Sequence, residues 1–275
     1  MENFPARAPR LIASDIDGTL LDRNHRVPRR NRDAVARAVQ QGAYFALSTG
    51  RPFRWIAPVL EQLPVRPVCV TSNGAVLYDS AEDRVMSAHE LSPAALAEVV
   101  DVAQTVLGTV GFGAERAGGS LGDAVEDLFV VERHYSENAL FEGFGVVSMG
   151  ELVGQPAVKF LIRNTDYSAP KLYELIAPHI DPELAHLTYS MQEGILEVAA
   201  PNVTKRRGVE WLAEHTGVAQ QETIAFGDMP NDIEMLRWAG CGVAMENAHP
   251  EVKAAADAVT VANHQAGVAK VLERW

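Results

Sequence analysis

Short apolar runs alternate with helical patterns along the first third of the chain. Each apolar run ends in polar residues and a glycine, as expected for a buried strand that leads into a loop. Pro28 and Gly42 mark the start and end of one helix, and residues 52–63 carry apolar side chains at helical spacing. Repeated strand, loop and helix units predict a parallel sheet with crossover helices, from strands at 11–14, 43–47 and 68–71 and helices at 28–41 and 52–63.

The middle of the chain has a different character. A hairpin is predicted to join two short strands, and the glycine-rich segment 108–122 is predicted to be irregular. These elements indicate an α/β cap built on an antiparallel sheet, with strands at 75–78, 84–87, 157–163 and 187–190 and helices at 93–107 and 169–178.

The strand–helix alternation resumes near Ile195. We therefore predict the α/β fold class, with a Rossmann-like parallel sheet and helices on both of its faces. The predicted catalytic core comprises residues 1–84 and 191–275, and an α/β cap at 85–190 is inserted between them. The last part of the core contains helices at 205–214, 231–238, 250–256 and 267–274 and strands at 223–226, 241–245 and 258–261.

The net charge of −12 is concentrated in the predicted cap, where 15 acidic and five basic side chains lie between residues 85 and 190. This charge argues against nucleic acid as a partner, because phosphates need a basic face. No apolar stretch approaches the roughly 18 residues of a membrane span, and no apolar signal core precedes Arg10. Cys69 and Cys241 lie in apolar runs, as reduced cysteines do. We expect a cytoplasmic protein without a membrane partner, either a monomer or a homodimer.

Two carboxylates, Asp15 and Asp17, directly follow the first apolar run and precede Gly18. The carboxyl edge of an open α/β sheet is where such folds bind their ligands. One carboxylate can attack a substrate while the other handles protons. Taken alone, the pair equally fits an acidic turn that caps the next segment.

Three further motifs follow in order along the chain: Ser48-Thr49-Gly50-Arg51, then Lys205, and then Gly227-Asp228 with Asn231-Asp232. With these motifs the chain resembles the haloacid dehalogenase superfamily of phosphatases, in its Cof-type branch (subfamily IIB), which carries a large cap after the third core strand. The resemblance covers nearly the whole chain and is least specific in the cap.

The resemblance implies a reaction through an aspartyl-phosphate. Asp15 would be the nucleophile, and Asp17 would be the general acid and then the base that activates water. Thr19 is expected to be structural and to support the Asp17 carboxylate.

Magnesium (Mg2+) is the implied cofactor, because it prefers oxygen ligands and bridges carboxylates to phosphate. Its expected ligands are the Asp15 side chain, the Asp17 backbone carbonyl and Asp228, with Asp232 holding a bound water or a supporting hydrogen bond. Without the first motif, the acids after Gly227 would fit simple helix capping.

Phosphate binding is implied for Ile16, Thr49, Gly50, Lys205 and Asn231. Lys205 opens a predicted helix, but Arg206 follows it where the family often has glycine, and Gly208 comes three residues later.

Two more residues near the predicted site keep two interpretations each. Asn73 either contacts substrate or only forms a turn with the glycine that follows it. Arg51 either adds positive charge at the site or pairs with a surface acid. Polar cap residues that could read the leaving group are Glu115, Arg116, Arg133, His134, Lys159 and Gln192.

The expected function is Mg2+-dependent hydrolysis of a small phosphorylated metabolite. The scarcity of positive charge in the cap favours a sugar phosphate or another leaving group without extra anions. A phosphomutase that uses the same aspartyl-phosphate step is the main alternative, and a non-catalytic ligand-binding module is a further one.

Overall fold

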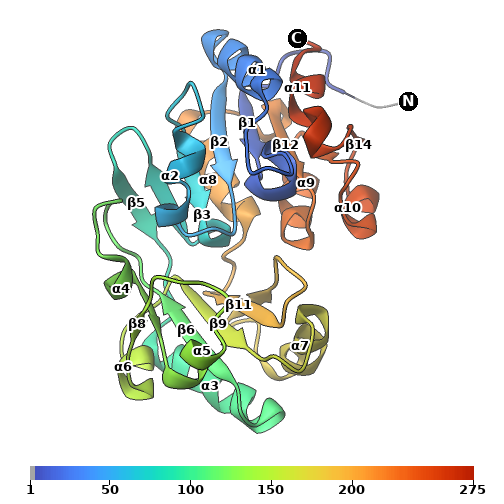
Figure 1. Ribbon diagram of the computed structural model, residues 1–275. Helices are drawn as coiled ribbons and strands as arrows, with labels where there is room; N and C mark the ends of the chain where they lie inside the picture. The colour runs from blue at the N-terminus through green and yellow to red at the C-terminus, as the bar shows by residue number, and fades with distance from the viewer. Residues whose placement is uncertain (1–3) are drawn as a thin grey trace. The chain divides into compact units, whose positions relative to one another are not determined.

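The computed structural model describes residues 4–275, which form two compact units (Figure 1). One unit comprises the chain up to Met86 together with Thr204–Trp275, and the other comprises Ser87–Val203.

The first unit is built on an eight-stranded sheet with the order β14-β13-β12-β1-β2-β3-β4-β5. Neighbouring strands from β14 to β3 run parallel, and β4 is antiparallel to β3. The predicted α/β class with a parallel sheet is therefore confirmed. The strands are β1 (Leu11–Ser14), β2 (Tyr44–Ser48), β3 (Val68–Thr71), β4 (Val76–Asp79), β5 (Arg84–Ala88), β12 (Thr223–Gly227), β13 (Cys241–Ala244) and β14 (Ala258–Val259).

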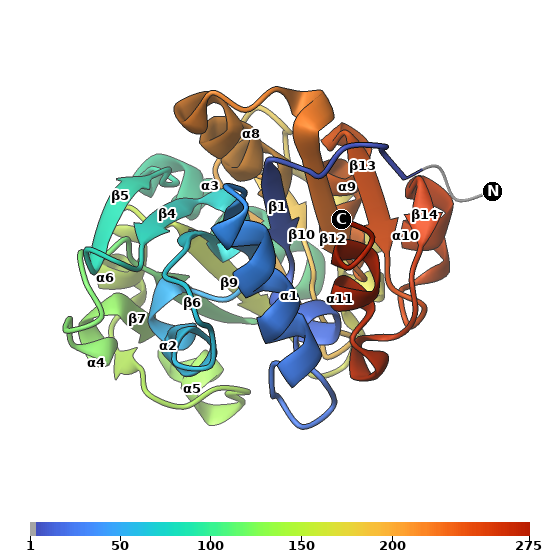
Figure 2. The same cartoon turned by 90° about the horizontal axis from the view of Figure 1, so that it is seen from above.

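Helices cover both faces of this sheet, with α1 and α11 on one face and α8 and α9 on the other (Figure 2). Among the helices of residues 4–275, none combines the length and the apolar character that a membrane crossing needs. The helices of this unit are α1 (Arg29–Gln40), α2 (Ala57–Leu60), α8 (Lys205–Thr216), α9 (Ile233–Trp238), α10 (Pro250–Ala255) and α11 (Gly267–Leu272).

The prediction of a continuous helix at 52–63 is wrong. A 3-10 turn at Phe53–Trp55 and the single helical turn of α2 stand in its place. Pro58 explains the break, because it has no N–H to donate to the preceding helical turn, whereas a proline is tolerated in the first turn of a helix such as α2.

Gly208 lets helix α8 lie close to strand β3. A Cβ at Gly208 would lie 2.3 Å from Val70 Cγ1, so only glycine lets α8 approach β3 this closely. The close approach sets the position of the first turn of α8, which begins at Lys205.

The second unit contains a six-stranded sheet with the order β10-β11-β9-β6-β7-β8, mainly antiparallel. Phe112 stacks on Phe160 on one face, and a cluster around Phe129, Tyr135 and Leu161 forms on the other. The strands are β6 (Gly111–Glu115), β7 (Phe129–Val131), β8 (Gly145–Val146), β9 (Lys159–Arg163), β10 (His186–Thr188) and β11 (Ile195–Ala199), and the helices are α3 (Pro93–Leu107), α4 (Val125–Leu128), α5 (Arg133–Glu137), α6 (Met149–Val153) and α7 (Ala169–Ile176).

Two predictions for the middle of the chain are wrong. The segment 108–122, expected to be irregular, contains β6 between β9 and β7. Gly111 serves packing, since a Cβ there would lie 2.8 Å from Tyr135 Cα of helix α5. The sequence predicts that residues from 191 onward belong to the core. Strand β11 within this segment pairs instead with β9 and β10 of the second unit, and the first unit resumes only at Thr204. All five residues of β11 are buried, so its apolar run cannot reveal which sheet it joins.

Candidate active site

Four loops at the carboxyl ends of adjacent strands bring the predicted site residues to one edge of the first unit's sheet. Strands β12, β1, β2 and β3 are neighbours, and they lead into Asp228, Asp15, Thr49 and Asn73 respectively. Lys205 joins them from the start of α8. Parallel strands end at the same edge, which is why motifs far apart in the sequence meet here.

Lys205 links two of the acids by ion pairs. Its Nζ lies 2.6 Å from Asp15 Oδ1 and 2.7 Å from Asp232 Oδ1, and all three side chains are buried. Although burial opposes its charge, Asp15 and Asp232 raise the pKa of Lys205 above its ordinary value. The two carboxylates thus favour the charged ammonium group, which holds the Asp15 carboxylate by a short hydrogen bond.

Asp228 and Asp232 form the other side of the cluster. Asp232 Oδ2 accepts hydrogen bonds from the backbone N–H groups of Asp228 and Met229, each at 3.0 Å. Thr19 Oγ1 donates to Asp228 Oδ1 at 2.9 Å. Thr19 therefore supports the Asp228 carboxylate, and the prediction that it supports Asp17 is wrong. Asp232 thus combines the capping role with membership of the acidic cluster.

The three carboxylates meet the requirements of a divalent cation. One oxygen from each of Asp15, Asp228 and Asp232 lies within 4.8 Å of the others, and all three residues are buried. Burial raises the pKa of Asp15 well above its usual range, against the lowering effect of Lys205, and Asp232 and Asp228 raise it further. Burial and Asp232 raise the pKa of Asp228 to about 7. Three acids share one ammonium group, so the positive charge of a bound cation would lower the pKa of both Asp15 and Asp228.

Three asparagines that sequence reasoning missed hold the turn after Asp15. Asn247 Nδ2 donates to Gly18 O at 2.8 Å, Asn263 Nδ2 to Leu21 O at 2.8 Å and Asn31 Nδ2 to Leu20 O at 3.1 Å. Asn31 lies on α1, Asn247 in the turn between β13 and α10, and Asn263 in a 3-10 turn before α11, and no spacing in the sequence marks them. The turn that carries Asp17 is therefore fixed from outside as well as by its own backbone.

Gly18 is required by both its conformation and its surroundings. Its φ is +78°, and a Cβ there would lie 2.2 Å from Asp228 Oδ2. The turn can therefore pass beside the Asp228 carboxylate only with glycine at this position.

We expect Gly18→Ala to destabilise the protein by about 2–3 kcal/mol and to weaken divalent-metal binding about tenfold or more, because the methyl group displaces Asp228. Urea unfolding and metal titration by calorimetry measure the two effects. Gly217→Ala is the matched control, since Gly217 has a φ of +64° but no atom within 4 Å of its added Cβ. It should lose about 1 kcal/mol and leave metal binding unchanged. Equal behaviour of the two variants would contradict the close-approach argument.

The loop after β2 places Thr49, Gly50 and Arg51 beside the turn that carries Asp17. Arg51 N donates to Thr49 Oγ1 at 3.1 Å, and the guanidinium Nε donates to Asp17 Oδ2 at 2.7 Å. A second bond joins Arg51 Nη2 to Asp17 Oδ1. Of the two interpretations of Arg51, pairing with an acid is observed, and that acid is Asp17, the second carboxylate of the predicted site.

The loop after β3 positions Asn73 by an unusual backbone. Ser72, Asn73 and Gly74 all have positive φ, of 49°, 57° and 100°. Asn73 forms the expected turn, and its Oδ1 also accepts a hydrogen bond from Asn231 Nδ2 at 3.0 Å. Among the described residues, Asn231 Oδ1 is buried without a partner. One N–H of the Asn231 amide is thus directed at Asn73, and the second N–H is the donor that a phosphate would use.

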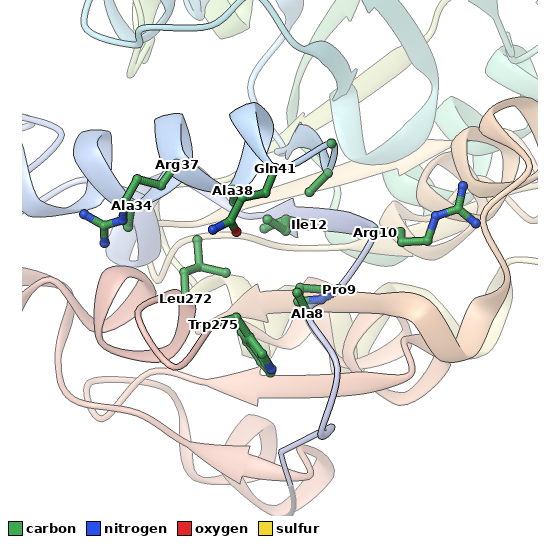
Figure 3. A pocket seen from close by; sticks show the side chains of 12 residues that line it. Ala8, Pro9, Arg10, Ile12, Ala34, Arg37, Ala38, Gln41, Leu272 and Trp275 are labelled. Atoms are coloured by element: carbon green, nitrogen blue, oxygen red, sulfur yellow. The ribbon is translucent and has the colours of Figure 1, made fainter.

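A separate cavity of about 280 Å³ lies at the opposite end of β1 (Figure 3). Ile12, Leu272 and Trp275 line it, together with the arginines 10 and 37. None of the predicted site residues borders this cavity, so it is distinct from the acidic cluster.

Comparison with known proteins identifies the family. The model of the haloacid dehalogenase-like hydrolases matches residues 12–272. The chain is 27% identical over 275 residues to the 5-amino-6-(5-phospho-D-ribitylamino)uracil phosphatase YitU of Bacillus subtilis, covering 97% of both chains. It is 30% identical over 278 residues to the HMP-PP phosphatase of Serratia proteamaculans, covering 97% of this chain and 95% of that one. Among solved structures, the subclass IIB sugar phosphatase BT4131 superposes with a TM-score of 0.76 at 24% identity, covering 96% of this chain and 98% of that one.

The fold, the acidic cluster and these matches define an enzyme that hydrolyses phosphoric monoesters. The chain belongs to the haloacid dehalogenase-like hydrolases.

Proposed function

We propose that the enzyme hydrolyses a small phosphomonoester through a phosphorylated Asp15, with Mg2+ bound in the acidic cluster. The observation that carries this proposal is the buried Asp15 carboxylate, paired with Lys205 and gathered with Asp228 and Asp232 at the carboxyl edge of the sheet. An acyl phosphate splits one difficult displacement into two easier ones.

In the first step an Asp15 carboxylate oxygen attacks phosphorus, and the bond from phosphorus to the leaving oxygen breaks. The Asp17 carboxyl group gives its proton to that oxygen, so the product leaves as a neutral alcohol. Lys205 remains paired with the Asp15 side chain and offsets the charge of the phosphoryl group. The Thr49 hydroxyl and the loop at Gly50 orient the phosphoryl oxygens.

In the second step water attacks phosphorus, and the bond between phosphorus and the Asp15 oxygen breaks. Asp17, now a carboxylate, accepts the proton of the attacking water. Orthophosphate leaves, and Asp15 and Asp17 return to their starting states.

The side chains of Asp15 and Asp228 and the Asp17 carbonyl would hold Mg2+, and Asp232 would support a bound water. Oxygen donors in this number suit Mg2+, which usually binds through one or two carboxylates and keeps several waters. When bound, the ion neutralises the phosphate and carboxylate charges that the buried site brings together. The nucleophile and the proton donor and acceptor are side chains of the protein itself.

We expect Mg2+ to raise the unfolding temperature more at about pH 8 than at about pH 6. The pKa of Asp228 is raised to about 7 in the metal-free protein. A carboxyl group with a raised pKa stabilises the folded state at low pH, and this contribution is lost as the pH rises towards the folded value. Mg2+ and the proton compete for the Asp228 carboxylate, and this competition weakens Mg2+ binding only below about pH 7. Thermal unfolding with and without MgCl2 measures the difference, and Asp228→Asn should abolish it. An equal effect of Mg2+ at both pH values would contradict the assignment.

Two observations support a sugar phosphate or a similar metabolite as the substrate. The named relatives act on small phosphorylated compounds, and one structural neighbour is a sugar phosphatase. The segment 85–190 carries a net charge of −10, which disfavours leaving groups with additional anions. We propose that this segment is the cap that selects the substrate, and that the enzyme acts in the cytoplasm.

A panel of phosphorylated metabolites incubated with Mg2+ tests the proposed reaction. We expect stoichiometric orthophosphate and the free alcohol from at least one sugar phosphate, and loss of turnover with EDTA. An isomerised sugar phosphate without free orthophosphate would instead establish the phosphomutase alternative. No reaction across the panel would favour the non-catalytic module.

A further inference from the structure

The carboxylate of Asp17 is held by one side chain, the guanidinium group of Arg51. Both oxygens of Asp17 accept N–H groups of Arg51, which is the fork geometry that fixes the plane of a carboxylate. Among residues 4–275, no other side chain forms a hydrogen bond with Asp17, which is half-exposed. Asp15, by contrast, is buried and fixed by Lys205. The orientation of Asp17 therefore depends on Arg51.

Arg51 is itself fixed by the neighbouring loops. Its N–H donates to Thr49 Oγ1 at 3.1 Å, and its carbonyl accepts a hydrogen bond from Ser72 N at 2.9 Å. Its Nη1 also donates to the carbonyl of Trp55 at 3.4 Å. The fork is thus presented to Asp17 by the loops after β2 and β3, and a lysine could not reproduce its two parallel bonds.

We propose that Arg51 is the positioning residue of the proton donor, aiming the Asp17 carboxyl group at the leaving oxygen. This inference rests on the proposed function, in which Asp17 gives its proton to that oxygen as the bond to phosphorus breaks. Proton transfer needs hydrogen-bond geometry, so a freely rotating Asp17 would be a poor donor even though its chemistry is unchanged.

A positioning role for Arg51 and a phosphate-binding role for Arg51 predict different kinetics. A leaving group that is stable as an anion departs without a proton, whereas a basic one requires it. Loss of a positioning residue therefore slows departure of the leaving group only where that group is basic. The ratio kcat/KM reports this step, because it excludes the later hydrolysis of phosphorylated Asp15. Loss of a phosphate ligand slows all phosphomonoesters alike, because every one presents the same phosphoryl group.

The experiment compares phenyl phosphate with 2,4-dinitrophenyl phosphate in the presence of Mg2+. For Arg51→Gln we expect kcat/KM with phenyl phosphate to fall about 100-fold and kcat/KM with the dinitrophenyl ester to fall less than about fivefold. Where hydrolysis of phosphorylated Asp15 limits turnover, kcat should fall for both esters, because Asp17 also activates the attacking water. Arg51→Lys should lie close to Arg51→Gln, because it keeps the charge without the fork. Added guanidinium should partly restore phenyl phosphate turnover to Arg51→Ala. Arg54→Gln removes the same charge three residues away, from an arginine stacked on Trp55, and should behave as the wild type.

Each other outcome is decisive. Equal losses of kcat/KM with the two esters would overturn the inference and make Arg51 a phosphate ligand or a purely structural residue, and a fall in unfolding temperature would identify the structural case. Unchanged kinetics would also overturn it. A wild-type enzyme inactive on both esters and on the metabolite panel would remove the proposed function itself, and the inference with it.

Discussion

Asp15→Asn is expected to lower phosphatase turnover by about 10,000-fold or more while the protein stays folded. Asparagine has no carboxylate to attack phosphorus, so neither step of the reaction can begin. Its amide oxygen can still accept the hydrogen bond from Lys205, and the substitution removes one of three acids from a buried cluster. Steady-state kinetics with Mg2+ and thermal unfolding measure the two parts of this prediction.

Asp101→Asn is the matched control, because Asp101 is exposed on α3 in the second unit. It should retain wild-type turnover within about twofold. Mg2+-dependent turnover that survives in Asp15→Asn would show that another residue is the nucleophile.

Lys205→Met is expected to lower the free energy of unfolding by about 3–5 kcal/mol at about pH 8 and to abolish turnover. The variant leaves three buried carboxylates close together without their ammonium partner. The pKa values of Asp15 and Asp228 are already raised in the wild type, by burial above all, and they would rise further. Protonation relieves the repulsion, so the loss should shrink at about pH 5.5. Urea unfolding at both pH values, with and without Mg2+, measures it.

Lys270→Met provides the control for Lys205→Met, since Lys270 is exposed on α11. It should change the free energy of unfolding by less than about 0.5 kcal/mol at either pH. A loss in Lys205→Met that is as small as this, or that does not depend on pH, would mean that the ammonium group does not compensate the acids.

The sequence predicts best the strands that end at the site. Strand β3 runs over the predicted residues 68–71, and β1, β2 and β12 agree within one residue at either end. These strands are buried on both faces, and each stops at a glycine-containing polar loop, so apolar content and loop chemistry point to the same boundaries. Parallel order then forces the loops to one edge, and this makes the meeting of Asp15 with Asp228 predictable.

The errors arise where long-range packing decides. Gly111 suggests an irregular segment until the approach of Tyr135 to β6 is known. The hydroxyl of Thr19 donates a hydrogen bond to Asp228, which lies 209 residues further along the chain. Asn31, Asn247 and Asn263 are ordinary polar residues in the sequence and become anchors only through the carbonyls that the fold brings to them. Local pattern carries no information on such partners.

A crystal soaked with Mg2+ and orthovanadate tests the central claim most directly. Vanadate adopts the geometry of a phosphoryl group under attack. The account predicts vanadium bonded to an Asp15 carboxylate oxygen and a metal ion held between Asp15 and Asp228. Vanadate bound elsewhere, or no ion between these two residues, would contradict it.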